Sequence, residues 1–396
     1  MLLAAGTGLF AIQASAQSSV TLYGVVDTGL GYQSSSTSLG STSGGRSAVK
    51  MINGVWAGSR FGLKGSEDLG GGTKAIFTLE EGFNSATGAQ SVNGVMFSRQ
   101  SFVGVTNDTY GSLTAGRQYA SYYQLLSPYS PTTWLTGFYG AHPGDIDGLD
   151  TDFRANNTLL YMSPTLYGFK FSGSYSLGGV PGSVNRGSTW TAAIQYAQGP
   201  VGLAVGFSRI NNSTLGGGPF GPDSTTSNAG AQIGVSALTN GYQTAQAQQR
   251  LAVGAGYTFS SQFDITAIYS NVQYIPGVGS SFRDQAIWNT GGLVLHWKPV
   301  TVWDFAAGYS YTRATSANGI ASAASYQQFN LSEYYNLSKR TGLYALQAYQ
   351  RAGGQTLGSN GKSIINATAT LGDGFNSTPS SSRSMVGIGV GIVHKF

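Results

Sequence analysis

The segment VGIGVGIVHKF, residues 386–396, decides the fold. Valine or isoleucine stands at every even position from Val386 to Ile392, and glycine stands at every odd position between them. Because successive side chains of a β-strand point to opposite faces, such a strand has one apolar face and one nearly bare face. A soluble sheet that buries one face usually carries charged residues on the other. The pattern therefore favours a strand of a membrane-embedded barrel over a strand of a soluble sandwich.

The same alternation recurs in VGLAVGFS (residues 201–208) and WDFAAGYS (residues 303–310). Charged residues make up only 9% of the 396 residues, well below the roughly 25% of soluble proteins. No run approaches the ~18 consecutive apolar residues that a membrane-spanning helix needs. A closed barrel is the other structure that satisfies every backbone group in lipid. The sequence therefore predicts an all-β, transmembrane antiparallel barrel.

Short and long connections alternate along the predicted strands, as in barrels that have tight turns at one end and long loops at the other. Counting the segments predicts about sixteen strands, and an even number allows the first strand, Ser19 to Tyr32, to pair with the last. Short connections are expected at 66–72, 107–111, 163–168, 198–200, 260–262, 298–301 and 338–342, and long ones near 35–46, 84–95, 118–153, 178–187, 211–248, 274–285, 314–325 and 352–382.

Residues 1–16 have the character of a secretory signal peptide, with a short apolar stretch and an Ala-Ser-Ala cleavage sequence at residues 14–16. A signal normally begins with basic residues, yet no lysine or arginine precedes Arg46; one explanation is a signal truncated at its start. We expect a signal peptide at 1–16 and a single barrel domain at 17–396. The absence of cysteine is compatible with export through an oxidising compartment.

Five segments carry a resemblance to a known family: SSVTLYGVVDTGLGY (18–32), GSRFGLKGSEDLGGGTKAIFTLEEGFN (58–84), FSRQSFVGV (97–105), YGSLTAGRQY (110–119) and GIVHKF (391–396). They resemble the general-diffusion porins of Gram-negative outer membranes, particularly the beta-proteobacterial branch. The resemblance runs from residue 17 to residue 396 and is specific up to Tyr119. It implies a homotrimer of sixteen-stranded barrels in the outer membrane, each a passive channel for small hydrophilic solutes and inorganic ions.

The resemblance also implies that the third loop folds inward and narrows the channel. It implies contact with outer-membrane lipid and lipopolysaccharide, and it makes the terminal Phe396 an assembly signal for the barrel-insertion machinery.

The connection at 118–153 is longer than a hairpin needs, and loops beyond ~15 residues are usually functional. Its acidic residues gather in GDIDGLDTD, residues 144–152, as Asp145, Asp147, Asp150 and Asp152. A calcium loop is the competing interpretation, but the glycine and glutamate that an EF-hand requires at its sixth and twelfth positions are missing. By resemblance this is the constricting loop, and we expect its carboxylates to face a basic wall.

Cationic residues of that wall are predicted partly by alternation. Arg60 alternates with Phe61 and Leu63, which places it and Lys64 on the inward face. The resemblance adds Arg99 and Arg154 to the wall, although Arg99 shares the parity of the outward Val103.

Two further strand residues complete the predicted set. Glu80 is in phase with Thr78, so we expect it to be an acidic partner in the wall. Arg117 has the outward parity of Leu113 and Ala115, which predicts a subunit contact. An arginine facing lipid at mid-membrane would cost roughly 2–4 kcal/mol, which favours an interface.

The sequence offers little for catalysis. The histidines are His142, His296 and His394, without zinc-site spacing, and His142 has no nucleophile elbow beside it. We therefore expect no enzymatic activity, no cofactor, no metal and no nucleic-acid partner. An outer-membrane barrel enzyme and a surface adhesin remain as alternatives. The net charge of +5 and the clustered wall cations favour anions weakly.

Overall fold

The computed structural model describes residues 18–38, 41–150, 154–220, 236–372 and 379–396. The predicted signal peptide at 1–16 and the predicted loop acid Asp152 lie outside the described residues.

Seventeen strands form one sheet, in which every pairing between neighbours is antiparallel. In chain order they are β1 (Ser19–Ser36), β2 (Arg46–Asn53), β3 (Arg60–Gly70), β4 (Thr73–Gly82), β5 (Gln100–Asn107), β6 (Gly111–Tyr119), β7 (Arg154–Met162), β8 (Phe169–Ser176), β9 (Thr189–Gln198), β10 (Val201–Asn211), β11 (Ala247–Ser260), β12 (Phe263–Ile275), β13 (Ala286–Val300), β14 (Trp303–Ala314), β15 (Ser325–Asn336), β16 (Thr341–Gly353) and β19 (Ser384–Lys395). A separate hairpin joins β17 (Gln355–Leu357) to β18 (Ile364–Asn366).

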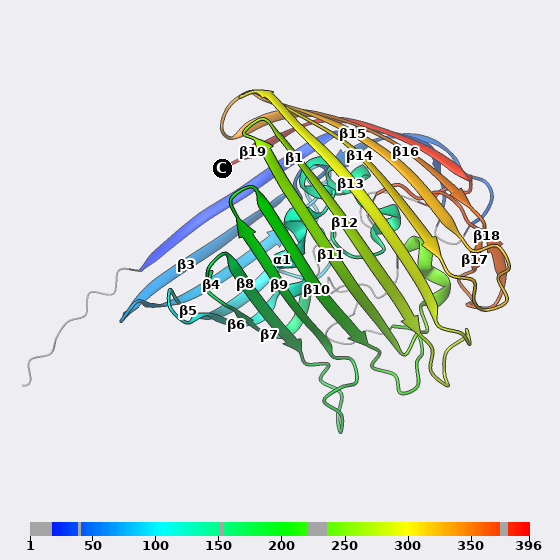
Figure 1. The fold of residues 1–396 in the computed structure, drawn as a ribbon, viewed down its shortest axis with the longest axis horizontal. Helices are drawn as coiled ribbons and strands as arrows, with labels where there is room; N and C mark the ends of the chain where they lie inside the picture. Colours follow the sequence, from blue (N-terminus) through cyan, green and yellow to red (C-terminus); the bar gives the residue numbers. More distant parts are fainter. Residues whose placement is uncertain (1–17, 39–40, 151–153, 221–235, 373–378) are drawn as a thin grey trace, which may run out of the picture.

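The sheet closes into a barrel through β1 and β19, which pair from Val25 opposite Lys395 to Gln33 opposite Gly387 (Figure 1). Both β2 and β3 pair with β1, one after the other along its length, so they are two halves of one interrupted strand. The barrel therefore has sixteen strands, and the predicted fold class is confirmed. The strand ends also reproduce the predicted alternation of short turns and long loops.

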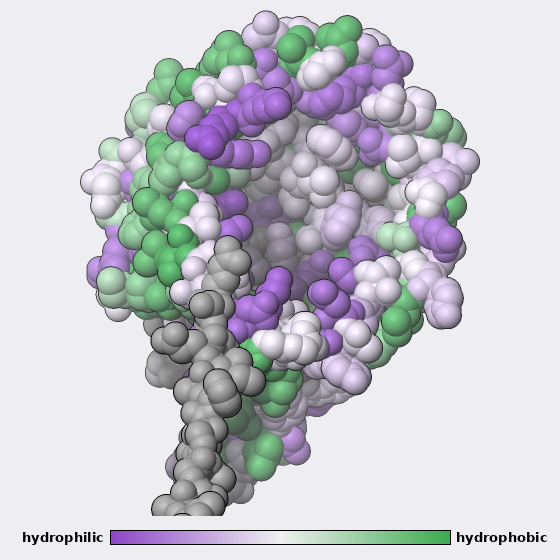
Figure 2. Space-filling view, turned by 90° about the vertical axis from the view of Figure 1, so that its left-hand side faces the viewer, coloured by the Kyte–Doolittle hydropathy of each residue, from purple (hydrophilic) through white to green (hydrophobic). Residues whose placement is uncertain are grey.

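The apolar residues of the alternating pattern face outward. On β19, the even-numbered residues from Val386 to Ile392 are 37–49% exposed. Seen from the left-hand side of Figure 1, the surface is hollowed in its middle, with hydrophilic residues in and around the hollow and hydrophobic residues over the outer flank (Figure 2). This division is the one that a lipid-facing barrel with a watery interior requires. None of the helices in the described part of the chain combines the length and the apolar character of a membrane-spanning helix.

The connection between β6 and β7 folds into the barrel. It contains α1 (Ser121–Leu126), η1 (Ser127–Tyr129), α2 (Thr132–Leu135), α3 (Gly137–Gly140) and η2 (Pro143–Asp145). We call residues 120–150 the constriction loop. Its α1 packs against the inner faces of β9 and β10, and α2 packs against β14 and β15 (Figure 1).

Inward glycines of the wall make room for this loop. A Cβ added to Gly206 of β10 would lie 2.7 Å from Leu126 Cδ1, and one added to Gly387 of β19 would lie 2.7 Å from Tyr139 Cε1. The bare face of the alternating pattern is therefore the surface on which the constriction loop rests.

Two more long connections turn inward near the long-loop end of the barrel. Residues from η3 (Ala237–Tyr242) and from the segment after β16 join wall residues in one apolar cluster. Its largest fully buried side chains include Tyr274, Trp288 and Tyr326. Beside the constriction loop, a cavity remains along the first residues of β3 and β7 and the segment that follows β4.

Candidate pore constriction

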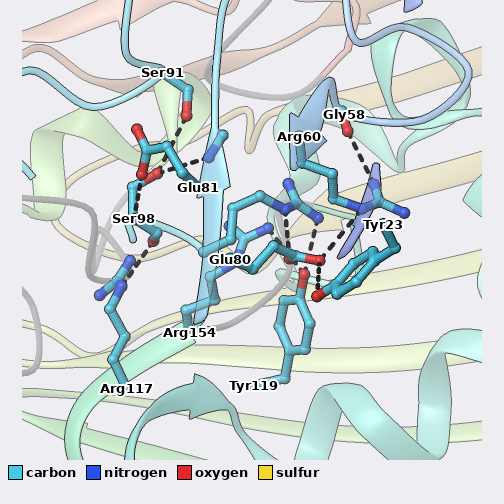
Figure 3. Close-up of polar contacts among 12 residues, drawn as sticks. Tyr23, Gly58, Arg60, Glu80, Glu81, Ser91, Ser98, Arg117, Tyr119 and Arg154 are labelled. Atoms are coloured by element: carbon cyan, nitrogen blue, oxygen red, sulfur yellow. Dashed lines mark hydrogen bonds and ion pairs between the residues drawn. The ribbon is translucent and has the colours of Figure 1, made fainter. Parts of the chain in front are cut away.

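Glu80 of β4 gathers two arginines on the inner wall (Figure 3). Arg99 Nε donates to Glu80 Oε1 at 2.8 Å, and Arg60 Nε lies 3.4 Å from Oε2. The hydroxyl of Tyr23 donates to Oε2 at 3.0 Å. Glu80 is 4% exposed, while the arginine side chains keep 14–25% of their surface. The cations therefore remain accessible, and their shared carboxylate lies beneath them.

Tyr119, at the end of β6, joins a third arginine to the group. Its hydroxyl accepts hydrogen bonds from Arg99 Nη2 at 2.9 Å and from Arg154 Nη2 at 3.2 Å. The Arg154 guanidinium carbon also lies 4.9 Å from the centroid of the Tyr119 ring. Guanidinium groups repel each other, so a shared neutral acceptor with a π face helps to hold them side by side.

The sequence pattern misses Tyr119 for a structural reason. The pairing of β6 with β7 shifts register between Gly116 and Gln118, so alternation does not assign a face to the residues that follow. Alternation does not predict the face of Arg99 either, because Arg99 precedes the first residue of β5. The chain just before it is not extended, since Phe97 has a φ of +58°.

The break between β2 and β3 shapes one border of the site. Asp27 of β1 accepts hydrogen bonds from the backbone N–H groups of Trp56 and Ala57 at 2.6 and 2.7 Å, and from the Tyr344 hydroxyl at 2.7 Å. The turn held in this way presents the Gly58 carbonyl, which accepts a hydrogen bond from Arg60 Nη1 at 2.9 Å. Nothing in the period-two pattern distinguishes Asp27 from other strand acids, so sequence reasoning did not select it.

A cavity of about 480 Å³ lies between this wall and the constriction loop. The wall contributes Arg60, Arg99 and Arg154, and the loop contributes Tyr123, Thr132, Gly137, Phe138 and Asp150. Of the predicted loop acids that the structure describes, Asp150 is the one that lines this space. The cavity thus has cations on the wall side and a carboxylate on the loop side.

The structure places Asp147 and Asp145 elsewhere than we expected. Asp147 has no exposed surface; its Oδ2 lies 2.6 Å from His142 Nδ1 and accepts the Ser270 hydroxyl at 2.8 Å. Asp145 is 6% exposed and accepts the backbone N–H of Asp150 at 3.0 Å. The Asp147 carboxylate bonds to the loop and the wall, and Asp145 bonds to the loop backbone, so both help to hold the loop in shape.

Burial by itself would raise the pKa of Asp147. Four effects lower the pKa: the charge of His142, the hydrogen bonds from His142 and Ser270, and the charge of Arg250. Together they outweigh burial and hold the pKa of Asp147 below its usual range. Arg250 of β11 is 3% exposed. Arg250 is an inward arginine that the sequence analysis missed. It lies on the part of the wall that the constriction loop covers.

Lys64 and Arg117 flank the arginine group. Lys64 Nζ sits 5.4 Å from the centroid of the Tyr23 ring. Arg117 is on the opposite side of β4 from Glu80 (Figure 3), where its Nε donates to the Ser98 carbonyl at 2.7 Å. It is 9% exposed and also bonds to Asn156. Its guanidinium is therefore largely covered within its own barrel.

Among the residues that the structure describes, no group of three or more histidines and acidic residues is arranged to hold a metal ion.

A closed antiparallel barrel with an apolar outer face, a polar lumen and an inward loop belongs to the class of transmembrane channel barrels. The family model for Gram-negative porins matches residues 2–355, and the chain belongs to this family.

Relatives agree with this assignment. The chain is 28% identical to outer membrane porin protein 32 of Delftia acidovorans over 393 residues, which cover 97% of this chain and 95% of that protein. It is 35% identical to an outer membrane porin of Bordetella pertussis over 225 residues, which cover 52% of this chain and 57% of that protein. The chain is thus an outer-membrane channel protein and not an enzyme.

Solved structures share the fold. The anion-selective porin from Comamonas acidovorans superposes with a TM-score of 0.68 at 23% identity, covering 96% of this chain and 100% of that one. OmpT of Vibrio cholerae, described in a trimer form, gives a TM-score of 0.64 at 14% identity, covering 96% and 99%.

Proposed function

We propose that the passage beside Arg60, Arg99 and Arg154 is the selectivity zone of a passive diffusion channel for small hydrophilic solutes, and that it prefers anions. The wall arginines and the loop carboxylate Asp150 set up a transverse field across the passage. Charged and dipolar solutes must align in this field to pass.

The observation that carries the proposal is the balance of charge around the cavity. Among the described residues, three guanidinium groups and the Asp150 carboxylate line the cavity, and Glu80 lies beneath two of the arginines, so these five charges sum to +1 (3 − 2). Guanidinium groups stay charged at any working pH. Glu80 is also more deeply buried than the arginines it binds, so a passing ion meets the cations first. The Comamonas porin with the same fold is described as anion-selective, which supports this direction.

Reversal potential in a salt gradient tests the proposal. Purified protein in a planar bilayer is expected to conduct and to show a modest anion preference in KCl. Arg99→Gln removes one of the three cations, so it should move the reversal potential toward zero or to the cationic side. Arg313→Gln, on the outer face of β14, is the matched control that should change nothing. A cation-selective wild type, or an Arg99 variant that keeps its full selectivity, contradicts the proposal.

We further propose the assembly context that the family resemblance implies. The chain forms a homotrimer, contacts outer-membrane lipid and lipopolysaccharide, and uses Phe396 as a signal for the barrel-insertion machinery. The Phe396 N–H donates to the Gly24 carbonyl at 3.1 Å and its carbonyl accepts from the Gly24 N–H at 3.1 Å, so the terminal residue completes the pairing with β1. Truncation of Phe396 should lower the yield of heat-modifiable trimer in the outer membrane; an unchanged yield argues against the signal.

A further inference from the structure

A second charged cluster lies on the inner wall, apart from the arginine group. It is centred on His296 of β13, which is 5% exposed. The ring Nδ1 is 2.7 Å from Asp264 Oδ2 on β12, and Nε2 is 3.2 Å from Asp304 Oδ1 on β14. Both ring nitrogens therefore face carboxylate oxygens.

Two carboxylates on opposite sides of the ring favour its doubly protonated form. An ionised carboxylate accepts hydrogen bonds and does not donate them, so with both aspartates ionised both ring nitrogens donate. Only the imidazolium form has two N–H donors. A neutral ring would place a lone pair against one of the carboxylates.

The remaining polar groups fit an imidazolium. Lys298 Nζ, on the same strand, lies 2.9 and 3.1 Å from the two oxygens of Asp304, and the Asn336 side chain donates to Asp304 Oδ2 at 3.0 Å. With His296 charged, two cations match two carboxylates. Among the described residues, Tyr334 on β15, opposite Asp304 in register, is a further titratable group on this side, and the α2 segment that covers the ring carries no charge.

The imidazole ring stacks on a side chain of the constriction loop. The centroids of Trp134 and His296 are 3.5 Å apart, and the planes differ by 5°. Tryptophan is the best aromatic partner for a cation. Two further contacts join this stretch of the loop to the wall. The Ser332 hydroxyl donates to the Trp134 carbonyl at 2.6 Å. The Leu135 side chain packs on Val294 and Ala306. Two residues before Trp134, Thr132 lines the channel cavity.

We propose that His296 is a positioning residue of this channel. As an imidazolium between Asp264 and Asp304, it holds Trp134 against the wall and so fixes the loop segment that borders the passage. Removal of its proton weakens both the stack and one hydrogen bond to the wall, and it frees this segment to move into the passage. Raising the pH therefore increases fluctuations of the open-channel current.

Single-channel recording from about pH 5 to about pH 9 tests the role of the ring proton. In the wild-type trimer, transitions to partly closed levels should become about tenfold more frequent as the imidazolium is lost, the factor that corresponds to about 1.4 kcal/mol. His296→Gln should show the frequent transitions at every pH. His296→Arg keeps a planar cation over Trp134 and should show few transitions at every pH.

Two variants and one spectroscopic measurement guard the interpretation. His394→Gln, on an exposed histidine of β19, should retain the wild-type pH profile. Trp134→Leu leaves the histidine and its carboxylates in place and should remove the pH step. If His296→Gln does not fold, the side-chain ¹⁵N resonances of the wild-type histidines at neutral pH decide the protonation state of His296.

A wild type without a pH step, a step that survives in His296→Gln or Trp134→Leu, or a neutral His296 ring at neutral pH overturns the proposal. Ion selectivity, measured in the same recordings, should be unchanged in His296→Gln. Failure of this inference is thus distinct from failure of the proposed anion preference.

Discussion

Substitution of Glu80 by glutamine should strengthen the preference for anions. Among the described residues, Glu80 pairs with two of the three wall arginines, and its loss raises the summed charge of these arginines, Glu80 and Asp150 from +1 to +2. The glutamine side chain keeps the volume and can still accept from Arg99 or Tyr23, so the wall should retain its shape. The variant changes the charge of the passage in the opposite direction to an arginine substitution.

The size of the effect follows from Coulomb's law. A unit charge about 5 Å from a passing ion contributes about 0.8 kcal/mol in water, and screening at 0.1 M salt reduces this to about 0.5 kcal/mol. The local concentration of anions should therefore rise about two- to fourfold, and that of cations should fall by a similar factor. Partial exclusion of water from the narrow passage would make the effect larger.

The assay is the reversal potential of purified trimers under a KCl gradient, measured for the wild type, Glu80→Gln and a matched control. Glu67→Gln is that control, because Glu67 is an exposed glutamate of β3 outside the passage. A shift toward cations in Glu80→Gln, or an equal shift in the control, would refute the reasoning that this wall controls selectivity.

Two further predictions concern how the constriction loop is held. Asp147→Asn should loosen the loop by about 2 kcal/mol, the contribution of a charged hydrogen bond. Since the native pKa of Asp147 is lowered, this contribution is present above about pH 4 and is lost as the pH falls through that lowered value. Below neutral pH, where His296 keeps its proton, wild-type current noise should therefore rise only in strong acid, whereas the variant should be noisy at every pH. Gly387→Val should displace Tyr139 and alter the single-channel conductance. Gly291 faces outward on β13 with open space around it, so Gly291→Val should leave the conductance unchanged. Equal effects of the two substitutions would contradict the close approach of the loop to the wall at Gly387.

Local patterning was sufficient to predict the barrel. Alternation in segments such as residues 386–392 depends only on the two-residue period of a strand and on the solvent that each face meets, and both are local properties of the chain. The inward position of Arg60 and Glu80 follows from the same period, because each lies within a regular strand. Arg99 needed the family resemblance, since it precedes its strand and alternation does not apply to it.

The tertiary structure alone decided which polar groups share the passage. Residues of the constriction loop have no fixed period, so the sequence treats Asp147 and Asp150 alike, and only the folded barrel brings Ser270 to one and the arginine wall to the other. The stack of Trp134 on His296 joins residues 162 positions apart (296 − 134). Such contacts depend on barrel closure and loop packing, which set distances between remote residues, whereas a strand pattern sets only which face a side chain occupies.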